Sequence, residues 1–241
     1  MDYRDKPIII IGVGHSGTRL LVEMLQRLGS DGGDYRNEWK ENKFFLQLHQ
    51  TMIEKMSNIE WTTALLSPEF VSSFQDDNVY HDYLLEEIQR GITTAYPNYK
   101  DAPWHWKCPI SLLFLETWSK IYPQGYYLHI QRDSYAVTES ILRRKQAPSV
   151  EAALALIDRY EERIEGFHAE NYLRVSFEDI ESEMDRMIRF LPLEPTQDQI
   201  DSARSIIKRD KPLWSSKRSI VQNLREYRIR RMIDAHKRRH P

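Results

Sequence analysis

The residues with the most evident chemistry lie near the start of the chain, in Gly12-Val-Gly-His-Ser-Gly-Thr-Arg19. Three glycines allow the backbone to approach an anion, and a helix that begins here would direct its N–H groups and positive dipole end toward that anion. The spacing from Gly12 to Gly17 matches a nucleotide P-loop, but Thr18 stands where that loop has a lysine. We therefore expect a phosphate-binding loop without the β/γ-phosphate cation of a nucleoside-triphosphate hydrolase.

A second candidate anion contact follows more than 110 residues later, where Arg132 ends an expected strand and precedes Ser140 by eight residues. A guanidinium group presents a planar fork of donors that suits phosphate. Eight residues make about two helical turns, so Ser140 returns to the same side of the helix. Alone, Arg132 followed by Asp133 is more often an ion pair at a strand end. The combination with the glycine-rich loop is far more specific.

These two segments resemble the sulfotransferase family, whose donor is 3′-phosphoadenosine 5′-phosphosulfate (PAPS). The family's 5′-phosphosulfate loop reads Gly-x-x-Arg/Lys-Ser-Gly-Thr-Thr/Ser-Leu-Leu, and the segment from Gly12 to Leu21 is similar. His15 replaces the usual Arg/Lys and Arg19 replaces the usual Thr/Ser, which moves the positive charge by four residues. The family's 3′-phosphate pattern is Arg-Asp-Pro followed by a serine. The segment from Arg132 to Ser140 resembles it, with serine in place of proline.

Two shorter segments extend the resemblance. Lys107-Cys-Pro109 is similar to the family's Lys-x-Pro segment, and Leu173-Arg-Val-Ser-Phe-Glu-Asp-Ile180 is similar to its Tyr-Glu-Asp-Leu junction between a strand and a helix. The likeness therefore covers roughly residues 7–36 and 104–218.

The resemblance implies an in-line displacement at sulfur by an acceptor hydroxyl, with PAPS as co-substrate and no metal required. Lys107 is implied to neutralise charge on the bridging oxygen of the donor, while Arg132 and Ser140 hold the 3′-phosphate. The 5′-phosphate is implied to lie on the loop residues Gly14, His15, Ser16, Gly17, Thr18 and Arg19.

The general base is open among three candidates. In the small-molecule branch of the family the base is a histidine two residues after the lysine, and Pro109 at that place excludes this version. The carbohydrate and protein-tyrosine branches use a glutamate near the start of the second βα unit, where Glu38 falls. Glu41 lies one helical turn further along, and a neutral His15 imidazole beside the sulfuryl group is the third candidate. We rank them in that order.

The end of the chain combines a candidate donor loop with a basic tail. Trp214, Lys217 and Arg218 fall where the family has a late loop over the adenine and the 3′-phosphate. From Lys217 to Pro241 there are nine Lys/Arg and two Asp/Glu, although the formal net charge of the chain is −2. The tail suits contact with an anionic surface or a solvated helix face. We expect no specific nucleic-acid partner.

The elements that must position these residues alternate between strand and helix. Glycine closes the β-branched run at Ile8–Ile11, as is typical of a strand buried on both faces of a parallel sheet. Further strands are expected at 104–107, 126–130 and 172–177, and helices at 20–28, 38–56, 80–95, 110–121, 134–145, 150–168, 178–190 and 196–208. This order predicts an α/β fold of P-loop-like, three-layer architecture, with a mainly parallel sheet flanked by helices. We expect one domain over residues 1–241, with a helical insertion at about 41–100 and a basic helix at about 221–241.

Composition narrows the class of protein. The chain has 241 residues, of which 41% are hydrophobic and 29% charged, as in globular proteins and unlike disordered ones. The single cysteine, Cys108, excludes an intrachain disulfide and a cysteine-based metal cage, and the histidines lack metal-ligand spacing. No apolar run approaches the roughly 18 residues of a membrane span, and no secretory signal is evident. We expect a cytoplasmic protein without a transmembrane segment.

Two alternatives to a sulfotransferase acting on a carbohydrate, lipid or other metabolite remain. One is a P-loop-type nucleotide kinase or hydrolase, and the other is a non-catalytic nucleotide-binding module. The acceptor, a small molecule or a glycan, is not legible in the sequence. Several aromatic residues suit a binding pocket as well as a core: Trp39, Phe44, Phe45, Trp61 and Tyr83.

Overall fold

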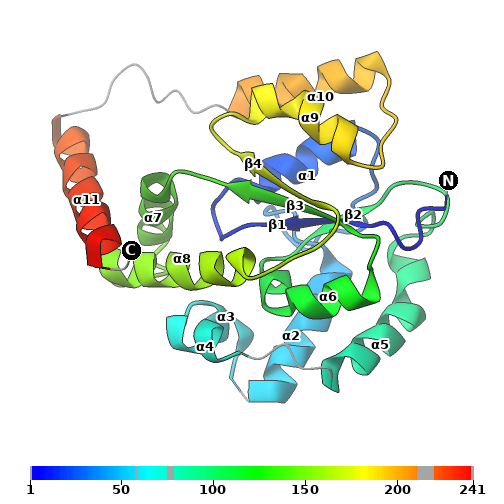
Figure 1. The fold of residues 1–241 in the computed structure, drawn as a ribbon, viewed down its shortest axis with the longest axis horizontal. Helices are drawn as coiled ribbons and strands as arrows, with labels where there is room; N and C mark the ends of the chain where they lie inside the picture. Colours follow the sequence, from blue (N-terminus) through cyan, green and yellow to red (C-terminus); the bar gives the residue numbers. More distant parts are fainter. Residues whose placement is uncertain (1, 58, 75–78, 211–219, 240–241) are drawn as a thin grey trace.

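Four parallel strands form the centre of the protein in a computed structural model that describes residues 2–57, 59–74, 79–210 and 220–239 (Figure 1). The strands are β1 (Ile8–Ile11), β2 (His105–Lys107), β3 (Tyr126–Gln131) and β4 (Tyr172–Ser176). Their order in the sheet is β2-β1-β3-β4, and each neighbouring pair is parallel. The predicted α/β class with a parallel sheet is confirmed.

The side chains of β1 explain why its sequence is an unbroken run of isoleucine. Ile9 and Ile11 pack into the hydrophobic core on one face of the sheet, and Ile8 and Ile10 pack into the core on the other face. All four side chains are buried. Because successive residues of a strand point to opposite faces, a central strand covered on both sides needs an apolar residue at every position.

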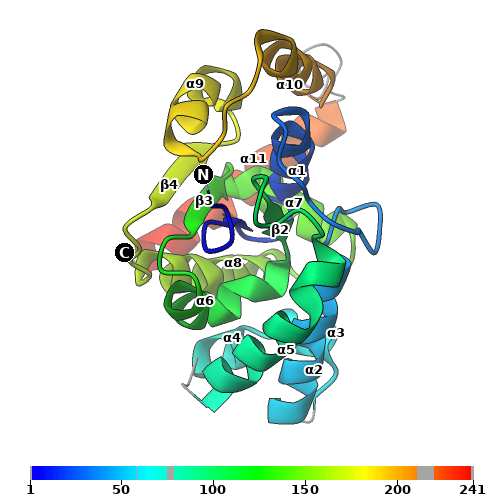
Figure 2. The same cartoon turned by 90° about the vertical axis from the view of Figure 1, so that its right-hand side faces the viewer.

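Helices cover both faces of this sheet (Figures 1 and 2). One face carries α1 (Thr18–Arg27), α9 (Ile180–Phe190) and α10 (Gln197–Asp210). The opposite side holds the 3₁₀-helix η1 (Pro109–Phe114) with α6 (Leu115–Ile121), α8 (Val150–Glu165), α2 (Lys43–Ser57), α3 (Trp61–Leu65), α4 (Pro68–Ser73) and α5 (Val79–Ala95).

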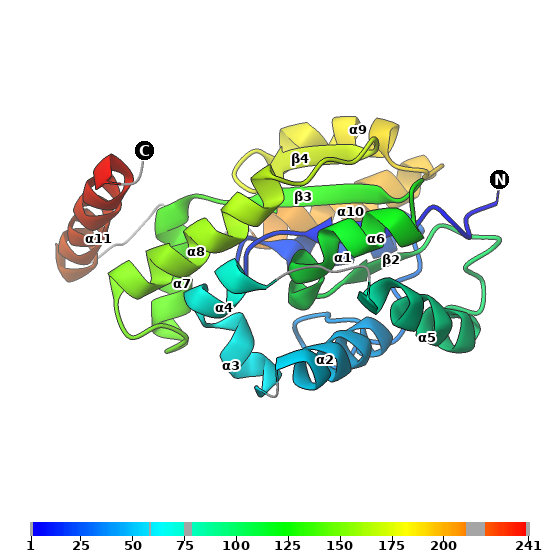
Figure 3. The same cartoon turned by 60° about the horizontal axis from the view of Figure 1, so that its bottom comes forward.

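The basic helix near the end of the chain lies outside these layers. The elements concerned are α7 (Ser134–Arg143) and α11 (Ile220–Arg239). In Figure 3, α11 stands at one end of the molecule beside α7 and α8, away from the sheet. Its Ile229 and Ile233 pack with Tyr135 and Leu154 in a small apolar cluster. Within the described ranges, every helix is too short or too polar to cross a bilayer.

Two predicted helices differ from the structure near the candidate site. The helix expected at 38–56 begins only at Lys43, because the Asn37 side chain accepts hydrogen bonds from the backbone N–H groups of Trp39 (3.1 Å) and Glu41 (3.4 Å). Such local bonds compete with helical ones, and they hold residues 37–41 in a loop. The helix expected at 110–121 starts as the 3₁₀-helix η1 and becomes α-helical at Leu115.

Because three histidines are buried, we expect acid to destabilise the fold. Burial lowers the pKa of His49 and of His105 to about 3 and that of His129 to about 4. Between these values and the unfolded pKa of about 6.5, only the unfolded chain binds the protons, so stability is lost as the pH falls. At pH 5.5 we expect each histidine to lower the free energy of unfolding by about 1.4 kcal/mol relative to neutral pH.

Urea unfolding at pH 7.5 and pH 5.5 measures this change. His129→Gln should remove about 1.4 kcal/mol of the pH dependence, the contribution of one such histidine. The exposed His168 offers a matched control, and His168→Gln should leave the pH dependence intact. A free energy of unfolding that is constant or rises toward pH 5.5 would refute the prediction.

Candidate functional site

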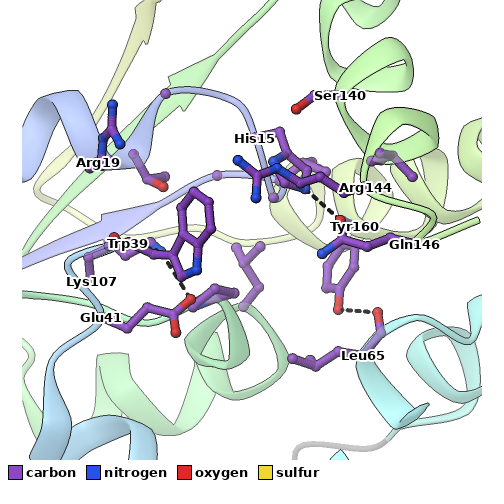
Figure 4. Close-up of a pocket in the computed structure, with 18 of the residues that line it drawn as sticks. His15, Arg19, Trp39, Glu41, Leu65, Lys107, Ser140, Arg144, Gln146 and Tyr160 are labelled. Atoms are coloured by element: carbon purple, nitrogen blue, oxygen red, sulfur yellow. Dashed lines mark hydrogen bonds and ion pairs between the residues drawn. The ribbon is translucent and has the colours of Figure 1, made fainter. Parts of the chain in front are cut away.

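The functional residues meet where the strands end. The glycine-rich loop follows β1, Lys107 is the last residue of β2, and Arg132 comes directly after β3. Because the strands are parallel, with Ile10 opposite both Lys107 and Leu128, these ends lie at one edge of the sheet. A cavity of about 620 Å³ opens there (Figure 4), as is typical of ligand sites in open α/β sheets.

Two glycines allow the loop to lie tightly against the ends of the strands. Gly17 has a φ of 106° and caps the N-terminus of α1, and a Cβ there would overlap the Phe177 ring. A Cβ on Gly12 would come within 2.7 Å of the Ile130 carbonyl oxygen. In contrast, a Cβ on Gly14 would meet no described heavy atom within 4 Å. The loop is therefore closely packed beneath and open above, toward the cavity.

Gly17→Ala should destabilise the protein by about 2 kcal/mol or more, because it adds a strained φ and a clash with Phe177. Gly14→Ala is the matched control in the same loop. We expect it to change the free energy of unfolding by less than about 0.5 kcal/mol. Chemical denaturation of both variants tests the packing, and equal effects of the two substitutions would contradict it.

Arg132 lines the cavity, whereas the predicted donor-loop residue Ser16 is buried and is not among the lining residues. The Arg132 Nη1 atom donates to the His15 carbonyl oxygen at 3.2 Å, and its guanidinium lies 4.4 Å from the centre of the Phe177 ring. Burial lowers the pKa of Arg132. The Arg132 Nε and Ser16 Oγ atoms are buried without a hydrogen-bond partner among the described residues. Since buried polar groups are normally satisfied, the unpartnered Nε atom of Arg132, a residue of the cavity lining, favours a bound anion.

His15 lies in the glycine-rich loop and lines the cavity. Its φ of 71° is left-handed, and its Nε2 atom lies 2.5 Å from Oε1 of Gln146. Burial lowers its pKa, and the positive charges of Arg144, Lys107 and Arg132 lower it further, although the hydrogen bond to Gln146 opposes this. The lowered pKa favours the neutral imidazole, which can hydrogen-bond without adding positive charge.

Positive charge reaches the loop from Arg19 and from α7. Arg19 lines the cavity, but its side chain is 48% exposed and lies 3.8 Å from Glu23. Arg144, which the sequence analysis missed, lies at the end of α7 with its guanidinium 3.9 Å from the centre of the Trp39 ring. It follows Ser140 by four residues, about one helical turn. This spacing from Ser140 is the sequence pattern from which Arg144 could have been predicted to lie near the donor site.

The cavity lining also contains a buried ion pair, formed by Lys107 at the end of β2 and Glu41 in the loop before α2. Lys107 Nζ lies 3.3 Å from Glu41 Oε1, and the two side chains are only 8% and 14% exposed. The same ammonium donates to the Trp39 carbonyl oxygen at 3.5 Å, and Asn37 Nδ2 donates to Glu41 Oε2 at 2.7 Å. A carboxylate held by an amide and an ammonium is well positioned to take a proton in the cavity.

The structure separates the two candidate glutamates. Glu41 lines the cavity, whereas Glu38 is exposed and is not among the lining residues. Their expected helical spacing does not apply, because both lie in the loop before α2. The geometry therefore favours Glu41, which the sequence analysis ranked second.

The remaining predicted residues fall into three groups. Ser140 lines the cavity, as do Gly14, Thr18 and the aromatic residues Trp39 and Trp61. The other candidate aromatics belong to the hydrophobic core or pack against it, namely Phe44, Phe45 and Tyr83. Trp214, Lys217 and Arg218 lie outside the described residues. Among the residues that are described, no group of three or more His, Cys, Asp or Glu could hold a metal ion.

Comparison with known proteins gives a consistent result. A family model described as the sulfotransferase family matches residues 7–198. The sulfotransferase domain from the curacin biosynthetic pathway is 14% identical, with a TM-score of 0.54 over 80% of this chain and 76% of that one. The sulfotransferase domain from the Synechococcus PCC 7002 olefin synthase is 17% identical, with a TM-score of 0.54 over 93% and 87% of the two chains. No curated protein matches the sequence. At these identities the structural likeness shows a shared fold.

Proposed function

Because this chain belongs to the sulfotransferase family of PAPS-dependent enzymes, we propose that its cavity transfers a sulfuryl group from PAPS to an acceptor hydroxyl. The observation that carries the proposal is the Lys107–Glu41 pair at 3.3 Å in the same cavity as the glycine-rich loop and Arg132. The pair supplies a cation for the leaving phosphate and a carboxylate for the acceptor proton.

The residues present suit a donor with phosphate groups on the 5′ and 3′ positions of its ribose. The open backbone above Gly14 and the lining residues Gly17 and Thr18 suit the 5′-phosphosulfate at the N-terminus of α1. The unpartnered Nε atom of Arg132 and the nearby Ser140 hydroxyl suit the 3′-phosphate. Arg144 adds positive charge between these groups and Trp39.

Each residue of the buried pair has a defined task. Glu41, fixed by Asn37 and Lys107, takes the hydroxyl proton of the acceptor. Lys107 stabilises the charge that develops on the phosphate oxygen as it leaves. When bound, the donor supplies the sulfur that bonds to the acceptor oxygen. The bond between this sulfur and the phosphate oxygen breaks, and its electron pair stays on the phosphate oxygen. The neutral His15 can hydrogen-bond the sulfuryl group without acting as the base.

Incubation of the protein with ³⁵S-labelled PAPS and pools of candidate hydroxyl compounds tests this function. We expect label to enter an acceptor in the presence of the wild-type protein, and without added divalent metal. Glu41→Gln supplies the inactive control, because it removes the base and keeps the size of the side chain. Label transfer that persists undiminished in Glu41→Gln would count against the proposed role of the pair.

A further inference from the structure

The half of the cavity that faces away from the glycine-rich loop has an apolar wall. Six side chains, which we call the acceptor wall, come from α3 and the residue after it, from η1 and from α8: Trp61, Leu65, Leu66, Pro109, Leu112 and Leu156. The close-up view shows Leu65 and Tyr160 on this side, across the cavity from His15 and Ser140 (Figure 4).

The polar side chains on this side already have partners. The Tyr160 hydroxyl donates to the Leu65 carbonyl oxygen at 2.9 Å, which leaves its ring to face the cavity. Thr62 donates to the carboxylate of Glu60, and Asn37 donates to Glu41. A sugar presents several hydroxyl groups that need such donors and acceptors, because a buried polar group without a partner is costly.

From the acceptor wall we infer that the acceptor is an alcohol with an apolar body, rather than a glycan. This inference rests on the proposed function. Glu41 takes the proton of the single hydroxyl group, and the hydrocarbon part lies along the acceptor wall. An apolar lining with few convergent polar groups is typical of sites for such ligands.

The wall also extends to the surface of the protein. Leu66 lines the cavity, yet this residue is 40% exposed. Among the described residues, the other large hydrophobic residue with this exposure is Ile59. Ile59 is not among the cavity-lining residues. The acceptor wall therefore reaches solvent at Leu66, in the same cavity as Glu41. A hydrocarbon chain can leave the cavity at that end while its hydroxyl stays at the ion pair.

Calorimetric titration with 1-alkanols and with methyl α-D-glucopyranoside, in the presence and absence of 3′-phosphoadenosine 5′-phosphate (PAP), tests the inference. We expect 1-octanol to bind and methyl glucoside not to bind. From 1-butanol to 1-octanol, each added methylene should tighten binding about three- to fourfold, the increment for burying one CH₂ group. Equal affinity along the series, or binding of methyl glucoside alone, would overturn the inference.

A pair of matched variants locates the binding surface. Leu66→Gln should weaken 1-octanol binding about five- to tenfold, because it places an amide in the acceptor wall. Ile59→Gln changes an equally exposed residue outside the cavity and should leave the affinity unchanged. Equal effects of the two variants would show that 1-octanol binds elsewhere and would overturn the inference.

The same titrations separate this inference from the proposed function. If the protein binds PAP but not 1-octanol, the donor site of the proposed function is supported and the inference of an apolar acceptor is overturned. If the protein binds 1-octanol but not PAP, the proposed function is contradicted, and the inference that the acceptor is an apolar alcohol is overturned with it. The apolar site alone would then remain.

Discussion

Lys107→Met is expected to lower kcat for sulfuryl transfer by about 10²- to 10³-fold, the loss typical of removing one group that stabilises transition-state charge. Lys107 is buried at the end of β2, and its ammonium group forms the ion pair with the Glu41 carboxylate. Methionine keeps an unbranched side chain of similar length and lacks the charge. Initial rates with labelled PAPS and the acceptor found by the screen measure the effect.

A lysine far from the cavity provides the control for this experiment. Lys100 is exposed, and its ammonium lies 5.5 Å from the centre of the Tyr99 ring. Lys100→Met should retain full activity. Because Lys107→Met leaves Glu41 without its cation, the free energy of unfolding of both variants should be measured in parallel. A folded Lys107→Met protein with wild-type kcat would show that this lysine does not act on the leaving group.

Glu41→Gln is expected to lower the transfer rate by about 10²- to 10⁴-fold, which is the range for loss of a positioned general base. The amide keeps the shape of the side chain but does not take a proton from the acceptor hydroxyl. Binding of PAP should persist, since the proposed donor contacts are made by the glycine-rich loop, Arg132 and Ser140 and not by Glu41. The measurement combines transfer rates with calorimetric titration of PAP.

Glu38→Gln is the matched control, three residues away in the same loop. Its carboxylate is exposed and outside the cavity, so the variant should transfer sulfuryl groups at the wild-type rate. If Glu38→Gln were inactive and Glu41→Gln active, the assignment of the base would be reversed.

Local patterns in the sequence predicted the sheet and the donor side of the site. The unbroken isoleucine run of β1 carries its own signal of burial on two faces, and each strand was expected within about two residues of its observed bounds. Gly12–Arg19 joins a strand end to a helix start, and Arg132 follows a strand directly, with Ser140 eight residues later in α7. Their positions follow from chain order once the sheet is parallel.

Local side-chain bonds and tertiary packing decided what the helical periodicity of the sequence did not. Glu38 and Glu41 were expected one helical turn apart, but the bonds that Asn37 makes to the backbone keep this segment out of a helix. Helical spacing also does not separate Phe45, which stacks on Trp106 with ring centres 4.0 Å apart, from Trp39, which lines the cavity. Both are aromatic residues in one stretch of chain, and only the packing of the other elements distinguishes them.

Calorimetric titration with PAP tests the central claim most directly, because it examines the donor site without knowledge of the acceptor. We expect PAP to bind without Mg²⁺ and more tightly than ATP with Mg²⁺. Arg132→Ala should weaken PAP binding about 10- to 100-fold, the effect of losing a charge-assisted hydrogen bond. Adenosine 5′-phosphate, which lacks the 3′-phosphate, should bind both proteins equally. Absence of PAP binding, or an equal effect of Arg132→Ala on both nucleotides, would contradict the assignment of this cavity to the sulfuryl donor.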